Sequence, residues 1–363
     1  MPTLAQSHRD LADRPGPGKT PTQKKRKSME LTFLGTSAGT PTKARNVTGL
    51  ALQHGGPRQW YLIDCGEGTQ HRLLHTRHSV MQLQAIFITH VHGDHTFGLP
   101  GLLASASMSG RTEPLPVIGP PELKSFIETT LACTDSSLGF ELQFFNSQAE
   151  HFFWQDHGIQ VTTAALSHRV PCHAFIFTER SLERQLLKDR LLRDGIVAGP
   201  AWGQLQRGED VVLEDGRTLR CDDYTLVDRL PRRLVVAGDN DNPELLAAAC
   251  EQAQVLVHEA TYTQEVSDRV GPWPQHSSAA QVAGFAERAG VPNLVLTHFS
   301  SRYQFPSPDG QSKGPVITEL ADEAQTLYRG QLFLAKDFDH YRLTREGVLE
   351  ATVRPRLTNK NNH

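Results

Sequence analysis

Short apolar runs separated by turns recur along most of the chain, and their length and composition favour strands. The runs ELTFL, WYLID and RLVVA, which begin at Glu30, Trp60 and Arg233, are rich in aliphatic and aromatic residues and are short for helices. The predicted strands are 30–34, 48–52, 60–64, 85–89, 115–118, 159–165, 173–178, 233–237, 254–258, 293–297 and 331–335.

Helical signals follow several of these runs. Asn242 and Pro243 supply a cap and a first-turn proline ahead of ELLAAACEQA. Ser278 and Gln281 have the spacing of a capping box before the helical run VAGFAERAG. Because strands and helices are mixed along the whole chain, the pattern predicts an α/β fold in which helices cover the sheets.

One segment, residues 180–208, interrupts this alternation. A helical stripe is formed there by Leu182, Leu186, Leu187, Leu191 and Leu192. The stripe is followed by a stretch rich in glycine and proline between Gly195 and Gly203. The pattern predicts an amphipathic helix with a glycine-rich return, which is either a surface hairpin or a protruding arm.

The two ends of the chain lack such patterns. Residues 1–28 are polar, contain Pro15, Pro17 and Pro21 and end in a basic cluster, Lys24 to Lys27, so we expect a disordered basic tail. The basic cluster suits contact with RNA or a targeting role, but a solvated tail is the simpler interpretation. We expect the folded domain to span residues 29–345 and a C-terminal tail to span residues 346–363.

Composition narrows the class of protein. With 363 residues, 38% hydrophobic and 21% charged, the chain is an ordinary globular protein, and its net charge of −3 does not by itself indicate a nucleic-acid partner. The 5 cysteines never form a CxxC pair, which argues against a disulfide framework and a cysteine zinc module and favours the cytoplasm. We expect no membrane association, because no apolar run approaches about 18 residues.

The densest group of metal-binding side chains is HVHGDH, residues 90–95, directly after a predicted strand. His90 and His92 are two residues apart, so both can point the same way from extended backbone and bind one ion. Gly93 permits a tight turn, after which Asp94 and His95 can serve a neighbouring ion. Imidazole and carboxylate without thiolate suit Zn²⁺ first, with Mn²⁺ or Fe²⁺ as alternatives.

Further ligands are expected where other apolar runs end. RLVVAGD ends in Asp239, NLVLT leads into His298 and QVLVH ends in His258, and side chains at the carboxyl ends of strands converge on a crevice. His168, in LSHRVPCH, is a further candidate, and Asp239 is the best bridging ligand because a carboxylate has two oxygens. Two ions about 3.5–4 Å apart can activate water and stabilise charge on a phosphoryl or carbonyl oxygen. The sequence therefore predicts a two-metal hydrolase.

These motifs, in this order, resemble ribonuclease Z (tRNase Z or ribonuclease BN), the short-form tRNA 3′-processing endonucleases of the metallo-β-lactamase superfamily. The resemblance spans residues 29 to about 340 and rests on FLGTSAGTPTKARN with its PxKxRN loop, IDCGEGTQ, HVHGDHTFGLPGLL, SHRVPCHAF, AGDN, HEAT, HSSAAQ and LTHFSSRY. HxHxDH alone would specify only the superfamily, whereas PxKxRN with HEAT and HSS is far narrower. The resemblance implies a metallo-β-lactamase αββα sandwich, with two mixed sheets covered by helices.

The resemblance also implies roles for individual residues. Two zinc sites would be formed, the first by His90, His92, His168 and Asp239, and the second by Asp94, His95, Asp239 and His298. Asp94 would also orient and deprotonate the attacking water, and His276 would protonate the leaving 3′ oxygen or stabilise the transition state. Glu259 is expected to orient a histidine, since metal and catalytic histidines usually need such a partner. Asp64 is expected to fix a ligand loop.

For substrate binding, the resemblance implies that segment 180–208 is an exosite arm that grips the elbow of a tRNA precursor from the partner subunit of a homodimer. Gly199 and Pro200 match a Gly-Pro element of that arm. Arg184 and Lys188 are candidate phosphate contacts, although nearby acids almost cancel the basic residues of the arm. Lys43 and Arg45, in the PxKxRN loop, would sense the RNA 3′ end. Cleavage just after the discriminator base would leave a 3′-hydroxyl on the tRNA and a 5′-phosphate on the trailer.

Some positions depart from the family pattern. Asn240 stands where the family usually has Thr or Ser, the arm lacks a common Pro-Gly start, and an additional loop, about 304–314, follows Tyr303. We expect Asn240 to alter hydrogen bonding beside a ligand.

Two other interpretations remain open from the sequence. A small-molecule hydrolase of the same superfamily would have no use for the arm. An RNA-binding scaffold that had lost its metals would not retain all seven ligand positions.

Overall fold

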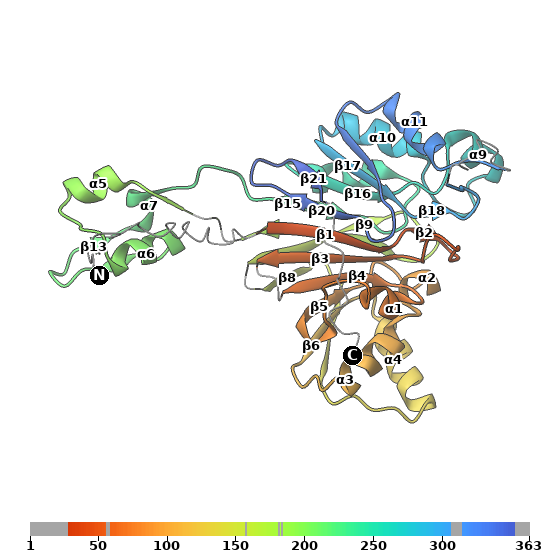
Figure 1. Cartoon of the computed structure of the whole chain (residues 1–363), viewed down its shortest axis with the longest axis horizontal. Coiled ribbons are helices and arrows are strands. Elements are labelled where there is room, and N and C mark those ends of the chain that lie inside the picture. The colour runs from red at the N-terminus through yellow and green to blue at the C-terminus, as the bar shows by residue number, and fades with distance from the viewer. Residues whose placement is uncertain are drawn as a thin grey trace, which may run out of the picture.

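Two β-sheets pack face to face and form the body of the molecule (Figure 1). The computed structural model describes residues 28–55, 59–156, 158–180, 182, 184–305 and 314–352. The 8-stranded sheet has the order β21-β20-β1-β3-β4-β5-β6-β7. Its strands are β1 (Ser28–Gly35), β3 (Gly49–Gly55), β4 (Trp60–Cys65), β5 (Leu83–Phe87), β6 (Leu115–Gly119), β7 (Leu142–Asn146), β20 (His340–Leu343) and β21 (Leu349–Ala351).

The second sheet has 7 strands in the order β19-β17-β16-β15-β10-β9-β8. Its strands are β8 (Phe153–Asp156), β9 (Ile159–Leu166), β10 (Cys172–Glu179), β15 (Arg233–Val236), β16 (Val255–Glu259), β17 (Asn293–Thr297) and β19 (Gln331–Leu334). Strands β15, β16, β17 and β19 are parallel, so their carboxyl ends lie at one edge. This edge is where an α/β protein builds a site.

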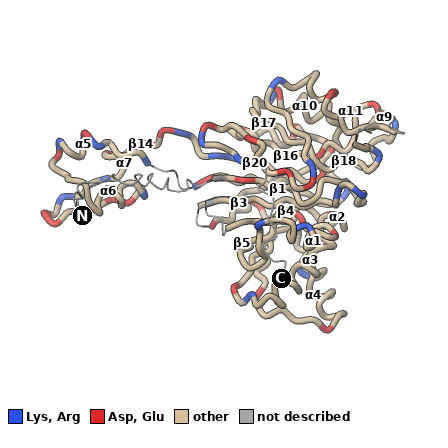
Figure 2. Tube along the Cα trace, in the orientation of Figure 1, with Lys and Arg blue, Asp and Glu red and all other residues tan. Residues whose placement is uncertain are grey.

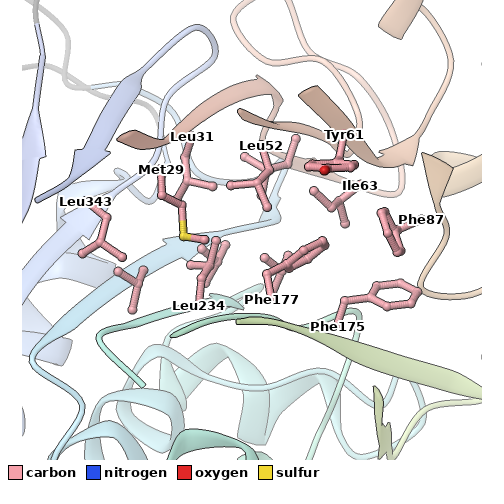
Figure 3. Packing of buried hydrophobic residues seen from close by; sticks show 14 of the residues in the cluster. Met29, Leu31, Leu52, Tyr61, Ile63, Phe87, Phe175, Phe177, Leu234 and Leu343 are labelled. Atoms are coloured by element: carbon pink, nitrogen blue, oxygen red, sulfur yellow. The ribbon is translucent and has the colours of Figure 1, made fainter. Parts of the chain in front are cut away.

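The core lies between the two sheets, where alternate residues of facing strands interdigitate (Figure 3). Met29 and Leu31 of β1 point toward the second sheet, and Phe175 and Phe177 of β10 point toward the first. Burial of each such side chain contributes about 1.5–3 kcal/mol. The alternation that predicted strands in the sequence therefore also supplies the contact between the sheets.

Helices cover the outer face of each sheet (Figure 1). The 8-stranded sheet packs against α1 (Thr69–Leu73), α3 (Leu99–Met108) and α4 (Glu122–Cys133). The other sheet packs against η2 (Pro243–Leu246), α8 (Ala247–Cys250), α10 (Ala279–Arg288) and α11 (Thr318–Gln325). The body is completed by η1 (Val80–Gln82), α2 (Gly93–Thr96) and α9 (Gln264–Val270). The predicted arrangement of two mixed sheets covered by helices is confirmed.

Most predicted elements are present, with shifts at their ends. Every predicted strand overlaps an observed one, and the capping box of Ser278 and Gln281 is confirmed in both directions. The helix expected after Pro243 begins as a 3₁₀ turn and ends at Cys250. Strands β7, β8 and β20 were not predicted, because their sequences are short and only partly apolar.

The expected C-terminal tail from residue 346 is wrong in its first part. Strand β21 pairs with β20, with Leu349 opposite Leu343, and Leu349 is buried in the core. The expected N-terminal tail lies outside the described residues except for Ser28, which begins β1.

The excursion between β10 and β15 is a protruding arm (Figure 1). It spans residues 180–232 rather than the predicted 180–208. Its elements are β11 (Gln185–Leu186), α5 (Lys188–Arg193), α6 (Pro200–Arg207), β12 (Val211–Val212), β13 (Thr218–Leu219), α7 (Cys221–Tyr224) and β14 (Thr225–Leu226). A separate small core holds it together, formed by Leu186, Leu191, Ile196, Leu205, Val211, Leu219 and Cys221. The arm is therefore a folded unit rather than a simple hairpin.

The described residues contain neither a membrane-spanning helix nor a disulfide. Within the described ranges, no helix is both long and apolar enough to cross a membrane. All five cysteines, Cys65, Cys133, Cys172, Cys221 and Cys250, are unpaired.

Candidate metal centre

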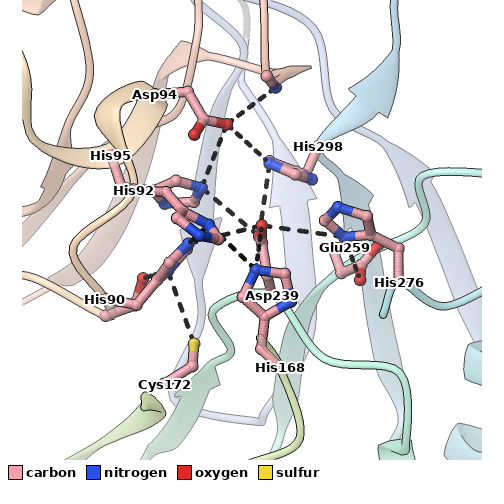
Figure 4. Close-up of polar contacts among 12 residues, drawn as sticks. His90, His92, Asp94, His95, His168, Cys172, Asp239, Glu259, His276 and His298 are labelled. Carbon is pink, nitrogen blue, oxygen red and sulfur yellow. Dashed lines mark hydrogen bonds and ion pairs between the residues drawn. The ribbon is translucent and has the colours of Figure 1, made fainter. Parts of the chain in front are cut away.

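Seven side chains from four segments meet at one end of the two-sheet body (Figure 4). One segment follows β5 and runs into α2, and the others follow β9, β15 and β17 or lie close to them. The side chains are those of His90, His92, Asp94, His95, His168, Asp239 and His298, the ligand set predicted from the sequence. Residues more than two hundred positions apart in the sequence thus share one site.

The side chains form two groups. Potential ligand atoms of His90, His92, His168 and Asp239 lie within 4.8 Å of one another. In this group the Nε2 atoms of His90 and His168 each lie 3.1 Å from Nδ1 of His92 and 3.7 Å from Oδ2 of Asp239. Three imidazole nitrogens and one carboxylate oxygen therefore surround a common point.

The second group comprises Asp94, His95 and His298. The Nε2 atoms of His95 and His298 lie 3.5 and 3.4 Å from Oδ1 of Asp239, and at the same two distances from Oδ2 of Asp94. Asp239 thus presents Oδ2 to the first group and Oδ1 to the second. Asp239 would therefore bridge two ions, if one were bound in each group.

Hydrogen bonds on the outer side of the imidazoles leave their inner nitrogens free for a cation. His168 Nδ1 donates to the Gln275 carbonyl at 3.0 Å, and His95 Nδ1 donates to Asp64 Oδ2 at 2.7 Å. The inner Nε2 of His95 is buried and has no hydrogen-bond partner among the described residues, although two carboxylates flank it. A buried, unpartnered nitrogen between two carboxylates fits a bound metal ion, and such outer partners orient metal ligands.

The pKa shifts of most of these side chains also favour metal binding. Burial lowers the pKa of His90, His92 and His168, so these imidazoles are neutral at pH 7, as metal ligation requires. Burial opposes ionisation of Asp94 and Asp239, but the neighbouring histidines outweigh it and hold the pKa of both carboxyls below the ordinary value. Burial also opposes protonation of His95, but Asp239, Asp64 and Asp94 outweigh it and raise its pKa, so His95 would release its proton when a metal ion binds between these carboxylates.

His276, which is partly exposed, pairs with the buried Glu259 beside these two groups. Glu259, at the end of β16, accepts from His276 Nδ1 at 3.0 Å and from the backbone N–H of Ser277 at 3.0 Å. Burial lowers the pKa of His276, but attraction by Glu259, Asp239 and Asp94 outweighs it and raises the pKa to about 9. Although His276 also lies within ligand distance of Asp239 and His298, its Nδ1 is committed to Glu259.

A backbone amide that the sequence analysis did not identify contacts Asp94. Gly39 N donates to Asp94 Oδ2 at 2.8 Å. Gly39 has φ 67°, in the left-handed region that glycine adopts without strain. Next to it, β2 (Ser37–Ala38) pairs with β18 (Phe299–Ser300), directly after His298. The glycine within TSAGT was the available signal, but its partner lies 55 residues away.

In the PxKxRN loop, Arg45 is buried instead of being available to RNA as predicted. Arg45 is only 3% exposed, its guanidinium donates to the Tyr303 carbonyl at 2.9 Å, and it lies over the Phe305 ring at 4.5 Å. The expectation that Arg45 contacts RNA is therefore wrong: it holds the loop against the segment after His298. Lys43, two residues earlier, is exposed.

The ends of this loop are held by a buried acid that the sequence analysis missed. Asp337 accepts from the Thr36 hydroxyl at 2.8 Å, from the Asn46 amide N–H at 2.7 Å and from Arg72 at 2.6 Å. The loop that carries Gly39 and Lys43 is thereby fixed at both ends.

Three further residues lie outside the ligand groups. Asp64, with φ 56°, accepts from His95 and from the Thr89 amide, which agrees with its expected part in fixing a ligand loop. His258 donates to the Glu259 carbonyl and faces Asn240 at 3.1 Å, so this strand-end histidine is not among the ligands. Asn240 also accepts from the Ser167 amide at 3.1 Å and thus supports the loop of His168.

The predicted RNA contacts of the arm lie far from these groups (Figure 1). Arg184 bonds to Asp222 at 2.6 Å and to Thr225 at 3.0 Å, so it is engaged within the arm. Lys188 is exposed and lines an open pocket of about 670 Å³ together with Arg190 and Arg193. Gly199 and Pro200 are exposed at the start of α6.

Comparisons with known proteins point to one family. Ribonuclease Z of Marinobacter nauticus is 64% identical over 318 residues, which cover 88% of this chain and 97% of that protein. Ribonuclease Z of a Pseudomonas putida strain is 55% identical over 325 residues, which cover 90% of this chain and 100% of that protein. The family model described as anti-Pycsar protein Apyc1 matches residues 29–178, less than half of the chain.

Solved structures agree on the fold. Human tRNase Z, short form, is 26% identical with a TM-score of 0.58, and the match covers 86% of this chain and 98% of that one. The metallo-β-lactamase fold protein YhfI from Bacillus subtilis is 18% identical with a TM-score of 0.58, covering 87% of this chain and 99% of that one. The latter likeness concerns the fold alone, and with it the predicted metallo-β-lactamase architecture is confirmed.

Proposed function

Because the chain belongs to the ribonuclease Z family and is a hydrolytic endoribonuclease, we propose that it removes 3′ trailers from tRNA precursors with two Zn²⁺ ions per chain. Cleavage just after the discriminator base leaves a 3′-hydroxyl on the tRNA and a 5′-phosphate on the trailer. The observation that carries the proposal is the position of Asp239, whose two oxygens face two separate groups of imidazoles.

In this proposal the first ion is held by His90, His92, His168 and Asp239, and the second by Asp94, His95, His298 and Asp239. Imidazole and carboxylate ligands without thiolate suit zinc. Such a pair of ions lowers the pKa of water and stabilises negative charge on the phosphoryl oxygens.

Asp94 orients the attacking water and accepts its proton. Its Oδ2 accepts a hydrogen bond from the Gly39 amide at 2.8 Å, which fixes the carboxylate beside the second ligand group. A carboxylate held in this way is aligned before the substrate arrives, and such alignment lowers the barrier because little reorganisation is needed.

His276 supplies the proton to the leaving 3′ oxygen of the tRNA. Its Nδ1 is bound to Glu259, so Nε2 is the nitrogen left to donate. Glu259 is in turn fixed by the amides of Ser277 and Thr261 and by the Thr261 hydroxyl at 2.5 Å. The rigid acid holds the imidazole in one orientation and favours its protonated form.

Binding of the tRNA body uses the arm of a partner subunit in a homodimer. Lys188, Arg190 and Arg193 line one open pocket, and phosphates bind to such clusters. The whole arm, residues 180–232, contains ten Lys and Arg residues and ten Asp and Glu residues, and Figure 2 shows both signs along it. Recognition of the tRNA by the arm therefore rests on local pockets and on the Gly199-Pro200 element rather than on net charge.

Near the ions, Lys43 contacts the RNA 3′ end. A cytoplasmic location accords with this substrate.

The alternative functions considered from the sequence are weaker. A metal-free scaffold would not need seven ligands whose outer nitrogens are also fixed by hydrogen bonds. A small-molecule hydrolase would have no use for a folded arm with its own core.

The decisive experiment incubates the protein with a labelled tRNA precursor that carries a 3′ trailer. We expect one cut, with a 3′-hydroxyl on the tRNA fragment, and about two zinc ions per chain by elemental analysis. Asp94→Ala should lower the rate by about 10²- to 10⁴-fold or more, since it removes the proton acceptor and a ligand. A metal-loaded wild type that leaves the precursor intact would refute the proposal.

A further inference from the structure

An exposed tryptophan stands three residues before His276. Trp273 is 78% exposed, whereas Trp60 is buried and Trp154 and Trp202 are partly buried. Tryptophan is highly buried on average, so an indole in solvent calls for a partner. Because Trp273 is close in the sequence to His276, the proposed proton donor, its position points to the RNA substrate as that partner.

The backbone around Trp273 is stiff. Proline flanks it on both sides, in the sequence GPWPQH, and each proline ring fixes its own φ. Gln275 N donates to the Pro272 carbonyl at 3.1 Å, which closes a turn around the indole. Because this backbone is already ordered, little backbone entropy is lost when a ligand binds to the exposed indole.

The same turn is anchored to the metal centre. The Gln275 carbonyl accepts from Nδ1 of His168, whose ring lies 5.2 Å from that of His276. Three residues span at most about 10 Å, so the Cα atom of Trp273 lies within about 10 Å of that of His276. The turn thus connects an exposed aromatic surface directly to a proposed ligand.

A positive charge also lies near His276, next to the Tyr262 ring. The Tyr262 ring is 6.2 Å from the His276 ring, and the exposed Arg302 guanidinium lies over Tyr262 at 5.4 Å. An aromatic surface and an arginine near a proton donor are features that bind single-stranded nucleic acid, by stacking on bases and by pairing with phosphates.

We propose that Trp273 is the stacking platform for the base of the last nucleotide that stays on the tRNA. The inference rests on the proposed function, in which His276 protonates the 3′ oxygen of that nucleotide. Because the 3′ oxygen and the base belong to the same nucleotide, the base lies on the same side of the cleaved bond as His276. Stacking tolerates all four bases, whereas hydrogen bonds to base edges would select one. An enzyme that processes many tRNAs needs such tolerance at this nucleotide.

The test combines a protein change with a substrate change. The proteins are wild type, Trp273→Ala and Trp273→Phe, and the substrates are a tRNA precursor and the same precursor with an abasic site at the last retained nucleotide. Base stacking on an aromatic side chain contributes about 1–3 kcal/mol, or about 5- to 150-fold. We expect Trp273→Ala and the abasic site each to lower kcat/KM by about tenfold, and Trp273→Phe to retain most of the activity.

The two changes should not add, because each removes one half of the same contact. Trp273→Ala should cleave the abasic precursor no more slowly than wild type does. Met108→Ala, which truncates a side chain that is 90% exposed on the far end of α3, is the matched control and should leave both rates unchanged. Zinc content and melting temperature should be equal in all variants.

Trp273 also provides a binding signal. Since it is the one exposed tryptophan of the four, the precursor should quench its fluorescence, and the abasic precursor should quench it less. If wild type cleaves the precursor and the two penalties add, or if Trp273→Ala has no effect, the stacking proposal is refuted while the proposed function stands. If metal-loaded wild type cleaves no precursor, both fall.

Discussion

At the scale of single residues, the metal centre depends on hydrogen bonds that orient its histidines from the side that faces away from the centre. His95 and His168 each bind an acceptor through Nδ1, so Nε2 of both must face the centre. His298 and Asp64 have φ of 57° and 56°, a strained backbone for residues other than glycine. Strain of this kind costs on the order of 1–3 kcal/mol and persists where the surrounding structure imposes it.

The first prediction concerns the acid behind the proposed proton donor. Glu259→Gln should lower precursor cleavage by about 10- to 100-fold, because the amide cannot hold His276 as the carboxylate does. Zinc content should stay at the wild-type value, since Glu259 is not in either ligand group. The measurement is kcat/KM on a tRNA precursor, together with elemental analysis.

Glu244→Gln is the matched control for that variant, because Glu244 is an exposed acid that pairs with Arg288. It should cleave at the wild-type rate. Full activity of Glu259→Gln would remove Glu259 from the mechanism.

The second prediction concerns Gly39. A β-carbon at Gly39 would meet no atom within 4 Å, so substitution changes backbone preference without a clash. Gly39→Ala disfavours the left-handed conformation by about 1–2 kcal/mol and should displace the amide from Asp94 Oδ2. We expect cleavage to fall by about tenfold, whereas Gly39→Asn, which tolerates this conformation, should retain more activity.

Gly110→Ala tests whether left-handed glycines matter in general. Gly110 has φ 86° and open space at its β-carbon, like Gly39, but lies after α3. This control should lose stability in thermal unfolding and keep its cleavage rate. Equal activity of Gly39→Ala and Gly39→Asn would show that the conformation of Gly39 does not position Asp94.

At the scale of elements, the arm is joined to the body by two antiparallel strands that are clamped by charge. Glu179, the last residue of β10, binds Arg229 at 2.7 Å and Arg232 at 2.9 Å, and both arginines lie just before β15. Glu179 is buried. Because a buried carboxylate is costly without its partners, this cluster determines how firmly the arm is held at its base.

The third prediction follows from the pKa of Glu179. Burial raises it, but the two arginines outweigh burial and lower it from 4.5 to about 2. A lowered pKa means that the stabilisation is fully present above the pKa of the unfolded chain, near 4.5, and is lost as the pH falls toward 2. Glu179→Gln should therefore be less stable than wild type at pH 7, by about 3–5 kcal/mol.

The measurement is the difference in unfolding free energy between wild type and Glu179→Gln at several pH values. The difference should shrink as the pH falls below about 4.5. Glu209→Gln, which disrupts an exposed pair with Arg207 in the same arm, should differ little from wild type at any pH. A difference that does not change with pH would show that packing, not charge, accounts for the effect of Glu179→Gln.

The elements also show which parts of the fold are predictable. Central strands such as β4, whose six residues are all buried, have largely apolar sequences and were predicted from them. The elements of the arm after residue 208 were not, because they are two to four residues long and are buried only through distant partners. Leu186 and Leu219 share the arm core although neither has an apolar run of its own.

The centre was more predictable than its surroundings. HxHxDH is a local signal, and strand ends mark the remaining ligands. The burial of Arg45 depends on Phe305 and Tyr303, about 260 positions later, and no pattern near Arg45 reveals it. The same holds for Gly39 and Asp337. Local spacing therefore identifies ligands, but the residues that orient them come from tertiary contacts between distant segments.

At the scale of the whole molecule, a catalytic body and a protruding arm are separate folded units with separate cores. The strands that flank the arm are already neighbours: Thr178 of β10 lies opposite Arg233 of β15, and Glu179 N donates to the Arg232 carbonyl at 2.9 Å. Removal of the arm therefore needs only a tight turn, and the body can keep its register.

The fourth prediction uses this geometry. Replacement of residues 181–230 by Asn-Gly, the usual two-residue turn of a β-hairpin, should leave the body folded and its metal content at the wild-type value. Hydrolysis of a small phosphodiester such as bis(p-nitrophenyl) phosphate should continue at the wild-type rate, because both ligand groups lie in the body. KM for a tRNA precursor should rise by about 10²-fold or more, since binding through a second site raises affinity by that order. Unchanged KM for the precursor in a variant that still hydrolyses the small substrate would mean that the arm does not bind tRNA, and its separate core would then need another explanation.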